Sequence, residues 1–209
     1  MIYIKSDKEI ELMRKPCEIV RDVLCLCEEK IRAGMTTKEL DKIAYDYITS
    51  CGATPSFLGY GGFPAATCIS IDEQVVHGFP SDRIIEEDQI VSVDVGAFFN
   101  GFHGDAARSL YVGHISPEKK KLIDVTRECF FEGIKGICIG SALGDIGAQV
   151  QEHAEKNGFS VVRDMVGHGV GRHLHEDPSV PNYGKRGVGV RLKRNMTIAI
   201  EPMINMGGY

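Results

Sequence analysis

Two aspartates, Asp94 and Asp105, lie on segments that the sequence predicts to form a hairpin. Segments 89–99 and 102–112 flank Asn100–Gly101, a dipeptide whose residues both tolerate positive φ. This is the strongest short-range signal for two antiparallel strands joined by a two-residue loop. The chemistry expected of such a hairpin depends on which face each carboxylate occupies.

The register of this hairpin brings both carboxylates to one face. A two-residue loop places Asp105 opposite Gly96, and because side chains alternate between faces, Asp94 shares that face. Their Cα atoms are then about 7–8 Å apart, whereas a bulge at Gly104 would shift the register by one residue. Two such carboxylates repel each other, so we expect a divalent metal between them. The alternative is that one faces solvent and the other pairs with Arg108.

A glycine-rich segment, MVGHGVGRHLHEDP, carries His168, His173 and His175. Small residues on both sides of His168 allow the backbone to pass close to a ligand. Neutral imidazole together with carboxylates suits Zn, Mn, Fe or Co better than Ca or Mg. His168 is therefore predicted to be a metal ligand, and Glu201, which ends TIAIE before Pro202, is a fourth candidate.

The other histidines are less informative. His77 follows a predicted strand in VVHGFP, where a substrate contact and a solvated turn are both open interpretations. His103 shares the predicted face of Asp105 and either supports a ligand or is exposed. His114 and His153 lie in polar surroundings and are expected at the surface.

Helices must hold these strands in place. Apolar residues spaced by three and four predict a helix over 10–31, which either kinks or restarts at Pro16. Thr36 or Thr37 is the expected N-cap of a second helix that ends near Cys51.

The helical pattern recurs further along the chain. Segments 31–52 and 137–158 align without gaps at an offset of 106 residues, and an offset of 107 pairs Asp94 with Glu201. We interpret this as a duplicated half-domain whose equivalent acids meet at a pseudo-twofold axis.

The composition is that of a soluble globular protein: 209 residues, formal net charge −5, 43% apolar and 25% charged residues. It excludes collagen, coiled coils and wholly disordered chains. No apolar run approaches the roughly 20 residues of a membrane span, and the charged N-terminus lacks a signal peptide, so a cytoplasmic protein is expected.

Seven scattered cysteines without a CxxC pair predict neither disulfides nor a cysteine zinc site. One local basic stretch is interpreted as a solvated hairpin; its residues are Lys185, Arg186, Arg191, Lys193 and Arg194.

Taken together, the residues resemble the type I methionine aminopeptidases, metallopeptidases of the pita-bread fold. The matching stretches are SFLGYGGFPAATCISIDEQVVHG, IVSVDVGAFFNGFHGDAARS, VGHGVGRHLHEDP and TIAIEPM, within a resemblance from Ile10 to Ile204. The resemblance implies an α+β fold in which two pseudo-symmetric halves surround a curved antiparallel sheet with outer helices. Residues 1–209 would form one catalytic domain, with halves of about 1–113 and 114–209.

The resemblance also implies a ligand set for two divalent ions, drawn from Co, Mn, Fe, Zn or Ni. Asp94 would chelate one metal, Asp105 would bridge both, and His168 and Glu201 would hold the other. His77 and His175 match histidines that contact the substrate. The implied methionine pocket consists of Tyr60, Phe63, Cys68, Leu174 and Phe57. This sequence has Leu174 where an aromatic residue is common and Phe57 where a small residue or cysteine is common.

The implied reaction removes the N-terminal methionine of nascent proteins when the second residue is small. A metal-activated water would attack, His175 would donate to the oxyanion, and Glu201 would carry the proton to the leaving amine. The expected protein is a monomer with no membrane or specific nucleic-acid partner, and with transient ribosome contact through the hairpin after Asn182. Two alternatives are an Xaa-Pro peptidase relative and a non-catalytic binding module.

One feature departs from the family. Its fifth ligand, a bridging glutamate, lies on a strand beyond the position of Glu201, whereas this sequence ends at Tyr209. The catalytic domain is therefore expected to be incomplete at its C-terminus, with weaker metal binding and a tendency to aggregate.

Overall fold

The computed structural model describes residues 1–209, which form two compact units. The first, here called the aspartate unit, contains Lys8–Lys119 and Gly171–Leu174. The second, here called the histidine unit, contains Met1–Asp7, Lys120–Val170 and His175–Tyr209. Each unit combines a pair of helices with antiparallel strands, and each is described by itself below.

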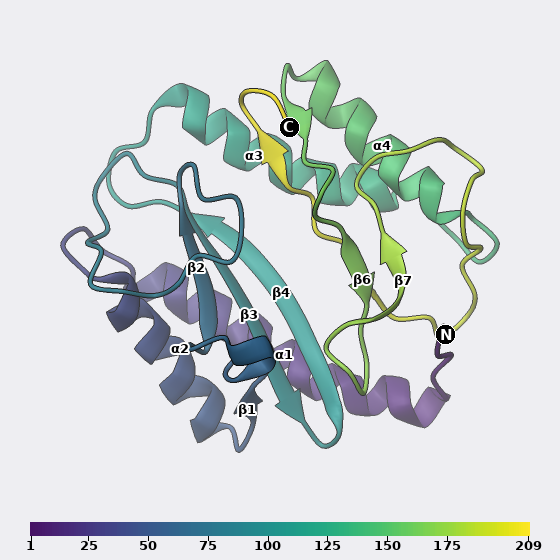
Figure 1. Cartoon of the computed structure of the whole chain (residues 1–209), viewed down its shortest axis with the longest axis horizontal. Coiled ribbons are helices and arrows are strands. Elements are labelled where there is room, and N and C mark those ends of the chain that lie inside the picture. The colour runs from purple at the N-terminus through teal and green to yellow at the C-terminus, as the bar shows by residue number, and fades with distance from the viewer. The chain divides into compact units, whose positions relative to one another are not determined.

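In the aspartate unit, two helices cover one face of a four-stranded antiparallel sheet (Figure 1). Strand β3 is central, with β1 and β2 paired along it and β4 joined to it by the hairpin. The elements are α1 (Asp7–Lys30), α2 (Thr37–Ser50), β1 (Thr54–Pro55), the 3-10 turn η1 (Tyr60–Gly62), β2 (Thr67–Ile71), β3 (Val91–Phe99) and β4 (Phe102–Leu110).

The predicted register of the β3–β4 hairpin is confirmed. Phe99 pairs with Phe102, and Gly96 pairs with Asp105, through an unbroken ladder. Asn100 and Gly101 both have positive φ, 48° and 87°, as the two-residue turn requires. The alternative of a bulge at Gly104 is wrong, because the pairing continues through that residue without a shift.

The first helix is a single element that passes through Pro16, so the predicted restart at this proline is wrong. Its backbone lies directly on β4. A Cβ atom at Gly104 would be 2.5 Å from the carbonyl carbon of Pro16 and 2.6 Å from the nitrogen of Cys17. Only glycine permits this approach, because both contacts are to backbone that cannot move aside.

In the histidine unit, the strands form two small antiparallel sheets. One pairs β5 with β9, and the other has the order β7-β6-β8. The elements are α3 (Pro117–Ile134), which begins in the aspartate unit, α4 (Leu143–Lys156), β5 (Ser160–Val161), β6 (Gly167–Gly169), β7 (Glu176–Val180), β8 (Ile198–Ala199) and β9 (Ile204–Asn205).

The alignment made from the sequence matches α2 with α4 residue for residue. Both helices have 14 residues, and α4 begins and ends 106 positions after α2. The N-terminal caps correspond too: Glu39 accepts from the Thr36 amide at 2.7 Å, and Asp145 accepts from the Ala142 amide at 2.7 Å. The second cap lacks the side-chain hydroxyl of the first, so it retains only the half of the capping box that the acid provides.

Each unit has its own apolar core, and each core contains a fully buried thiol. Cys27 of α1 packs among the valines of β3, and Cys129 of α3 packs against α4. Burial is the largest cause that raises the pKa of both thiols, from an ordinary value of 9.0 to about 12. Neighbouring carboxylates, Asp41 for Cys27 and Glu128 for Cys129, act in the same direction.

These thiols predict a loss of stability at alkaline pH. Above pH 9 the unfolded chain releases the thiol protons while the folded chain retains them. Each buried thiol therefore lowers the free energy of unfolding by about 1.4 kcal/mol per pH unit until about pH 12. Urea unfolding of Cys27→Ala/Cys129→Ala at pH 7.5 and pH 10 should show a smaller decrease than the parent chain. The matched control is the exposed Cys138→Ala, and an equal decrease in all three proteins would contradict the prediction.

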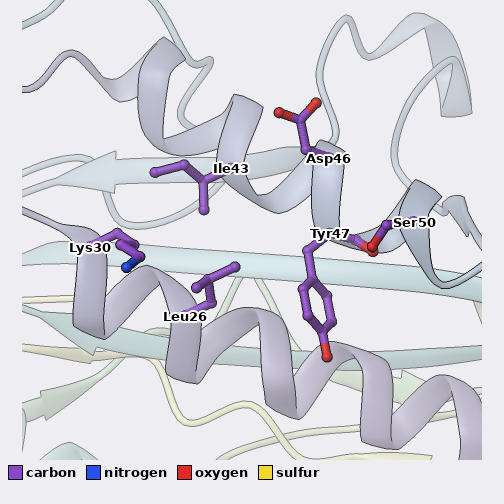
Figure 2. A pocket seen from close by; sticks show the side chains of 6 residues that line it. All are labelled: Leu26, Lys30, Ile43, Asp46, Tyr47 and Ser50. Carbon is purple, nitrogen blue, oxygen red and sulfur yellow. The ribbon is translucent and has the colours of Figure 1, made fainter.

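A shallow cleft of about 370 Å³ lies between α1 and α2 on the outside of the aspartate unit. Figure 2 shows the side chains of Leu26 and Ile43 pointing toward one another across it, with Tyr47 beside them. None of the candidate site residues lines this cleft. Across the whole structure, no helix combines the length and apolar character needed to cross a membrane.

Candidate metal and substrate site

Asp94 and Asp105 lie on the sheet face opposite the helices. The residues that alternate with Asp94, Val93 and Val95, are fully buried in the core against α1 and α2. Both aspartates are half-buried, and Asp105 lies opposite Gly96 in the ladder. The structure therefore places the two carboxylates as diagonal neighbours, as the hairpin register predicted.

Arg108 does not neutralise this pair. It lies opposite Val93 and so belongs to the helix side of the sheet, where it donates to Glu28 of α1 at 2.5 Å. The alternative that one aspartate pairs with Arg108 is wrong, because the hairpin alternation directs the guanidinium to the other face.

Cys68 of β2 adjoins the two carboxylates. It pairs directly with Asp94 in the ladder and is 5% exposed. Burial, followed by the charges of Asp94, Asp105 and Asp41, raises the pKa of its thiol to about 12. Cys68 is therefore a neutral, apolar side chain at physiological pH. Asp94 and Asp105 both lie near enough to disfavour its thiolate form.

The apolar residues expected to form a pocket largely come together around Cys68. Phe57, Cys68 and Leu174 form a buried cluster, with Phe63 packed against it. Tyr60, the remaining one, is half-exposed at the start of η1. The cluster joins three separate parts of the aspartate unit on the face that carries the carboxylates.

The loop that carries His77 is fixed against β2. Gly78 donates to Ser70 Oγ at 3.0 Å and accepts from the Ile69 amide at 2.9 Å. A Cβ atom at Gly78 would be 2.2 Å from the Ile69 carbonyl oxygen, so the loop requires glycine here. His77, at φ 59°, is exposed beside this anchor. Phe79, which the sequence analysis did not single out, stacks on Phe63 with ring centroids 5.2 Å apart.

The other histidines have structural or surface positions. His103 shares a strand face with Asp105, and its Nδ1 hydrogen-bonds Ser56 Oγ at 2.8 Å, so it is not simply exposed. His114 and His173 are exposed. His153 pairs with Glu128 at 2.9 Å on the outside of the histidine unit.

The histidine unit brings His168 and Glu201 together. His168 is on β6, and its Nδ1 lies 2.8 Å from the Gly169 carbonyl oxygen. Because a carbonyl oxygen can only accept, this contact places a ring proton on Nδ1, and Nε2 is the nitrogen that faces Glu201. Nε2 is 3.2 Å from Glu201 Oε1, a buried oxygen that makes no hydrogen bond.

This orphaned oxygen fits a metal ligand. Two donor atoms that each lie about 2.0–2.2 Å from one ion are separated by about 3.0–3.6 Å. The Nε2–Oε1 distance of 3.2 Å falls in that range, and Glu201 Oε1 makes no hydrogen bond. The structure contains no group of three or more His, Cys, Asp or Glu side chains that could hold a metal ion.

Glycines explain how β6 can carry His168 in the middle of its sheet. A Cβ atom at Gly167 would be 2.3 Å from the Ala199 carbonyl oxygen, and one at Gly169 would be 2.3 Å from the Asp177 carbonyl oxygen. The strands on both sides of β6 therefore approach closer than any side chain allows. His175, just before β7, has its ring centroid 4.3 Å from that of His168.

Asn182 is a further residue at this site that the sequence analysis missed. It is fully buried, and its Nδ2 donates to the Glu201 carbonyl oxygen at 2.6 Å. A polar residue in an apolar setting was the available signal, but only the structure shows that it holds the Glu201 backbone.

The signature of metallopeptidase family M24 matches residues 11–209. A methionine aminopeptidase of Clostridium perfringens is 54% identical over all of this chain and 84% of its own length. The chain belongs to metallopeptidase family M24, among the methionine aminopeptidases. Members of this family are hydrolases that depend on a divalent metal, in agreement with the predicted class of enzyme and cofactor.

Solved structures agree with this membership in the M24 family. The crystal structure of methionine aminopeptidase from Rickettsia prowazekii matches with a TM-score of 0.98 at 40% identity, covering 100% of this chain and 84% of that one. The enzyme from Thermotoga maritima matches with a TM-score of 0.97 at 46% identity, covering 99% and 84%. The predicted α+β pita-bread fold is confirmed.

Proposed function

We propose that this protein removes the N-terminal methionine from polypeptides whose second residue is small. The observation that carries the proposal is the pairing of Cys68 with Asp94, which sets an apolar cluster beside carboxylates on one sheet face. An unbranched thioether side chain suits an apolar pocket of this kind. The free α-amine of the same residue, being cationic, is attracted to the neighbouring carboxylates.

The metal-binding residues in this proposal are Asp94, Asp105, His168 and Glu201. Carboxylates and a neutral imidazole favour a divalent transition ion, and we propose that the set holds two such ions. Bound divalent ions supply a nucleophilic water near neutral pH and polarise the scissile carbonyl. The orphaned Glu201 oxygen, which lies 3.2 Å from His168 Nε2, supports the part of both residues in this set.

Other residues act on the substrate directly. His175 donates a hydrogen bond to the oxygen of the scissile carbonyl as negative charge develops there. Glu201 transfers a proton to the leaving amine. His77, exposed on its anchored loop, contacts the bound peptide. The methionine side chain lies against Phe57, Phe63, Cys68 and Leu174, with Tyr60 at the edge.

The substrates in this proposal are nascent chains in the cytoplasm, met by a monomeric enzyme. We also propose transient ribosome contact through the hairpin after Asn182. Two arginines of this hairpin already form ion pairs within the protein, which limits the residues available for that contact. Arg186 pairs with Glu152 at 2.6 Å, and Arg194 pairs with Asp7 at 3.1 Å. Lys185 and Lys193 are the residues of that stretch best suited to an external anion.

A panel of short peptides tests the proposed specificity. With Mn(II) or Co(II) present, Met-Ala-Ser should release methionine, while Met-Leu-Ser should be cleaved at least about tenfold more slowly because a small second residue is required. Cleavage of Ala-Pro in preference to Met-Ala-Ser would instead support an Xaa-Pro peptidase. Tight Mn(II) binding without cleavage of any peptide would support a binding module. Either result would overturn the proposal.

A further inference from the structure

The first residues of the chain are tied to two distant segments of the histidine unit. Ile2 forms a parallel bridge with Asp177 at the start of β7. The Lys5 amide donates to the Asn195 carbonyl oxygen at 3.1 Å. Asp7 then accepts from Asn195 Nδ2 at 2.7 Å. Residues 2–7 are therefore ordered by contacts that span almost the whole sequence.

A buried ion pair lies at the centre of this attachment. Lys5 Nζ is 2.5 Å from Glu176 Oε2, and the two side chains are only 5% and 2% exposed. The same ammonium is 3.4 Å from the Tyr3 carbonyl oxygen. Charged side chains are rarely buried unless they are paired, and removing one partner leaves the other as an uncompensated buried charge. Lys5 therefore fixes where the Glu176 carboxylate can be.

Glu176 is directly connected to the proposed chemistry. It is the first residue of β7 and immediately follows His175. It pairs with Gly169 of β6, where a Cβ atom would be 3.0 Å from the Glu176 carbonyl oxygen. Its backbone is thus closely packed on one side, and its side chain is held by Lys5 on the other. The backbone of His175 is therefore anchored through Glu176, and its exposed imidazole packs on His168.

We propose that Lys5 is a positioning residue for His175 and acts through Glu176. The inference rests on the proposed function, in which His175 donates to the substrate carbonyl. Without the ammonium, the buried Glu176 carboxylate loses a cationic partner, and the start of β7 shifts as the carboxylate moves. The His175 donor is then displaced from the reacting carbonyl, and displacements of about 1 Å can cost about 100-fold in rate.

Kinetics of Met-Ala-Ser cleavage by Lys5→Met test this role. We expect kcat to fall about 10–100-fold with a smaller change in KM, because the hydrogen bond from His175 to the substrate carbonyl strengthens as negative charge develops on that oxygen. Lys5→Arg should recover part of kcat, and Lys5→Met/Glu176→Gln should recover most of it, because the uncompensated charge is gone. The matched control is Lys42→Met, which breaks the exposed Lys42–Asp46 pair of α2. Equal kcat in Lys5→Met and the parent chain would overturn the proposal, as would a double variant no better than Lys5→Met.

A second measurement is independent of turnover. In protein labelled with ¹⁵N-histidine, Lys5→Met should shift the ring signal of His175, assigned with His175→Gln, while the His153 signal stays in place. An unchanged His175 signal would overturn the positioning role even if the parent chain were inactive. A parent chain that releases no methionine from Met-Ala-Ser would instead reject the proposed function. If Lys5→Met does not fold, Glu176→Gln, which leaves Lys5 without its partner, is examined in the same two ways.

Discussion

Asp105→Asn is expected to lower the rate of methionine release by about 1000-fold. The substitution keeps the shape of the side chain but removes one negative charge from the pair that Asp94 and Asp105 form on the sheet face. Divalent ions contribute several kcal/mol to such reactions, and each 1.36 kcal/mol corresponds to a factor of ten. Losing a carboxylate from the ligand set should forfeit most of that contribution.

Removal of the metal should lower the rate of methionine release in the same way. It should also distinguish a role of Asp105 in binding the metal from a role in holding the fold. Treatment with EDTA should abolish release of methionine from Met-Ala-Ser, and Mn(II) should restore it in the parent chain but not in Asp105→Asn. Ser109→Ala is the matched control, because Ser109 lies on the same face of β4 and its hydroxyl hydrogen-bonds Ser92 Oγ at 2.9 Å. Activity of Asp105→Asn within tenfold of the control would contradict the ligand role.

His175→Ala should reduce kcat about 100–1000-fold while leaving the affinity for Mn(II) unchanged. This is the usual cost of removing one donor to a developing oxyanion. Stopped-time assays with Met-Ala-Ser and calorimetric titration with Mn(II) measure the two quantities. His153→Ala is the matched control, because that imidazole pairs with Glu128 at the surface of α4. A variant with raised KM and unchanged kcat would show that His175 only binds the ground state.

Features set by local chemistry were predictable from the sequence. The hairpin register follows from Asn100–Gly101, since two residues of positive φ and strict side-chain alternation leave one arrangement of β3 and β4. The second helix follows from its capping box at Thr36 and Glu39. At Pro16 the same reasoning left a kink and a restart open, and the structure excludes the restart because one helix continues through the proline, where it packs on Gly104.

Features that join distant segments could not be predicted in this way. Lys5 and Glu176 are 171 positions apart, and nothing in either local pattern indicates the other. Asn182 was unremarked because its partner, the Glu201 carbonyl, is a backbone atom that no residue pattern identifies. Leu174 was proposed as a pocket residue only through family resemblance, and its contact with Phe57 and Cys68 arises because residues 171–174 return to the aspartate unit.

In the proposed function, Asp94 and its neighbours hold the metal at which methionine is released. The most direct test is release of methionine from Met-Ala-Ser with Mn(II) or Co(II) by this chain and by Asp94→Ala. We expect release by the parent chain and a decrease of about 1000-fold or more in the variant. Equal release by both proteins would contradict the assignment of Asp94, and release by neither would contradict the proposed function of this chain.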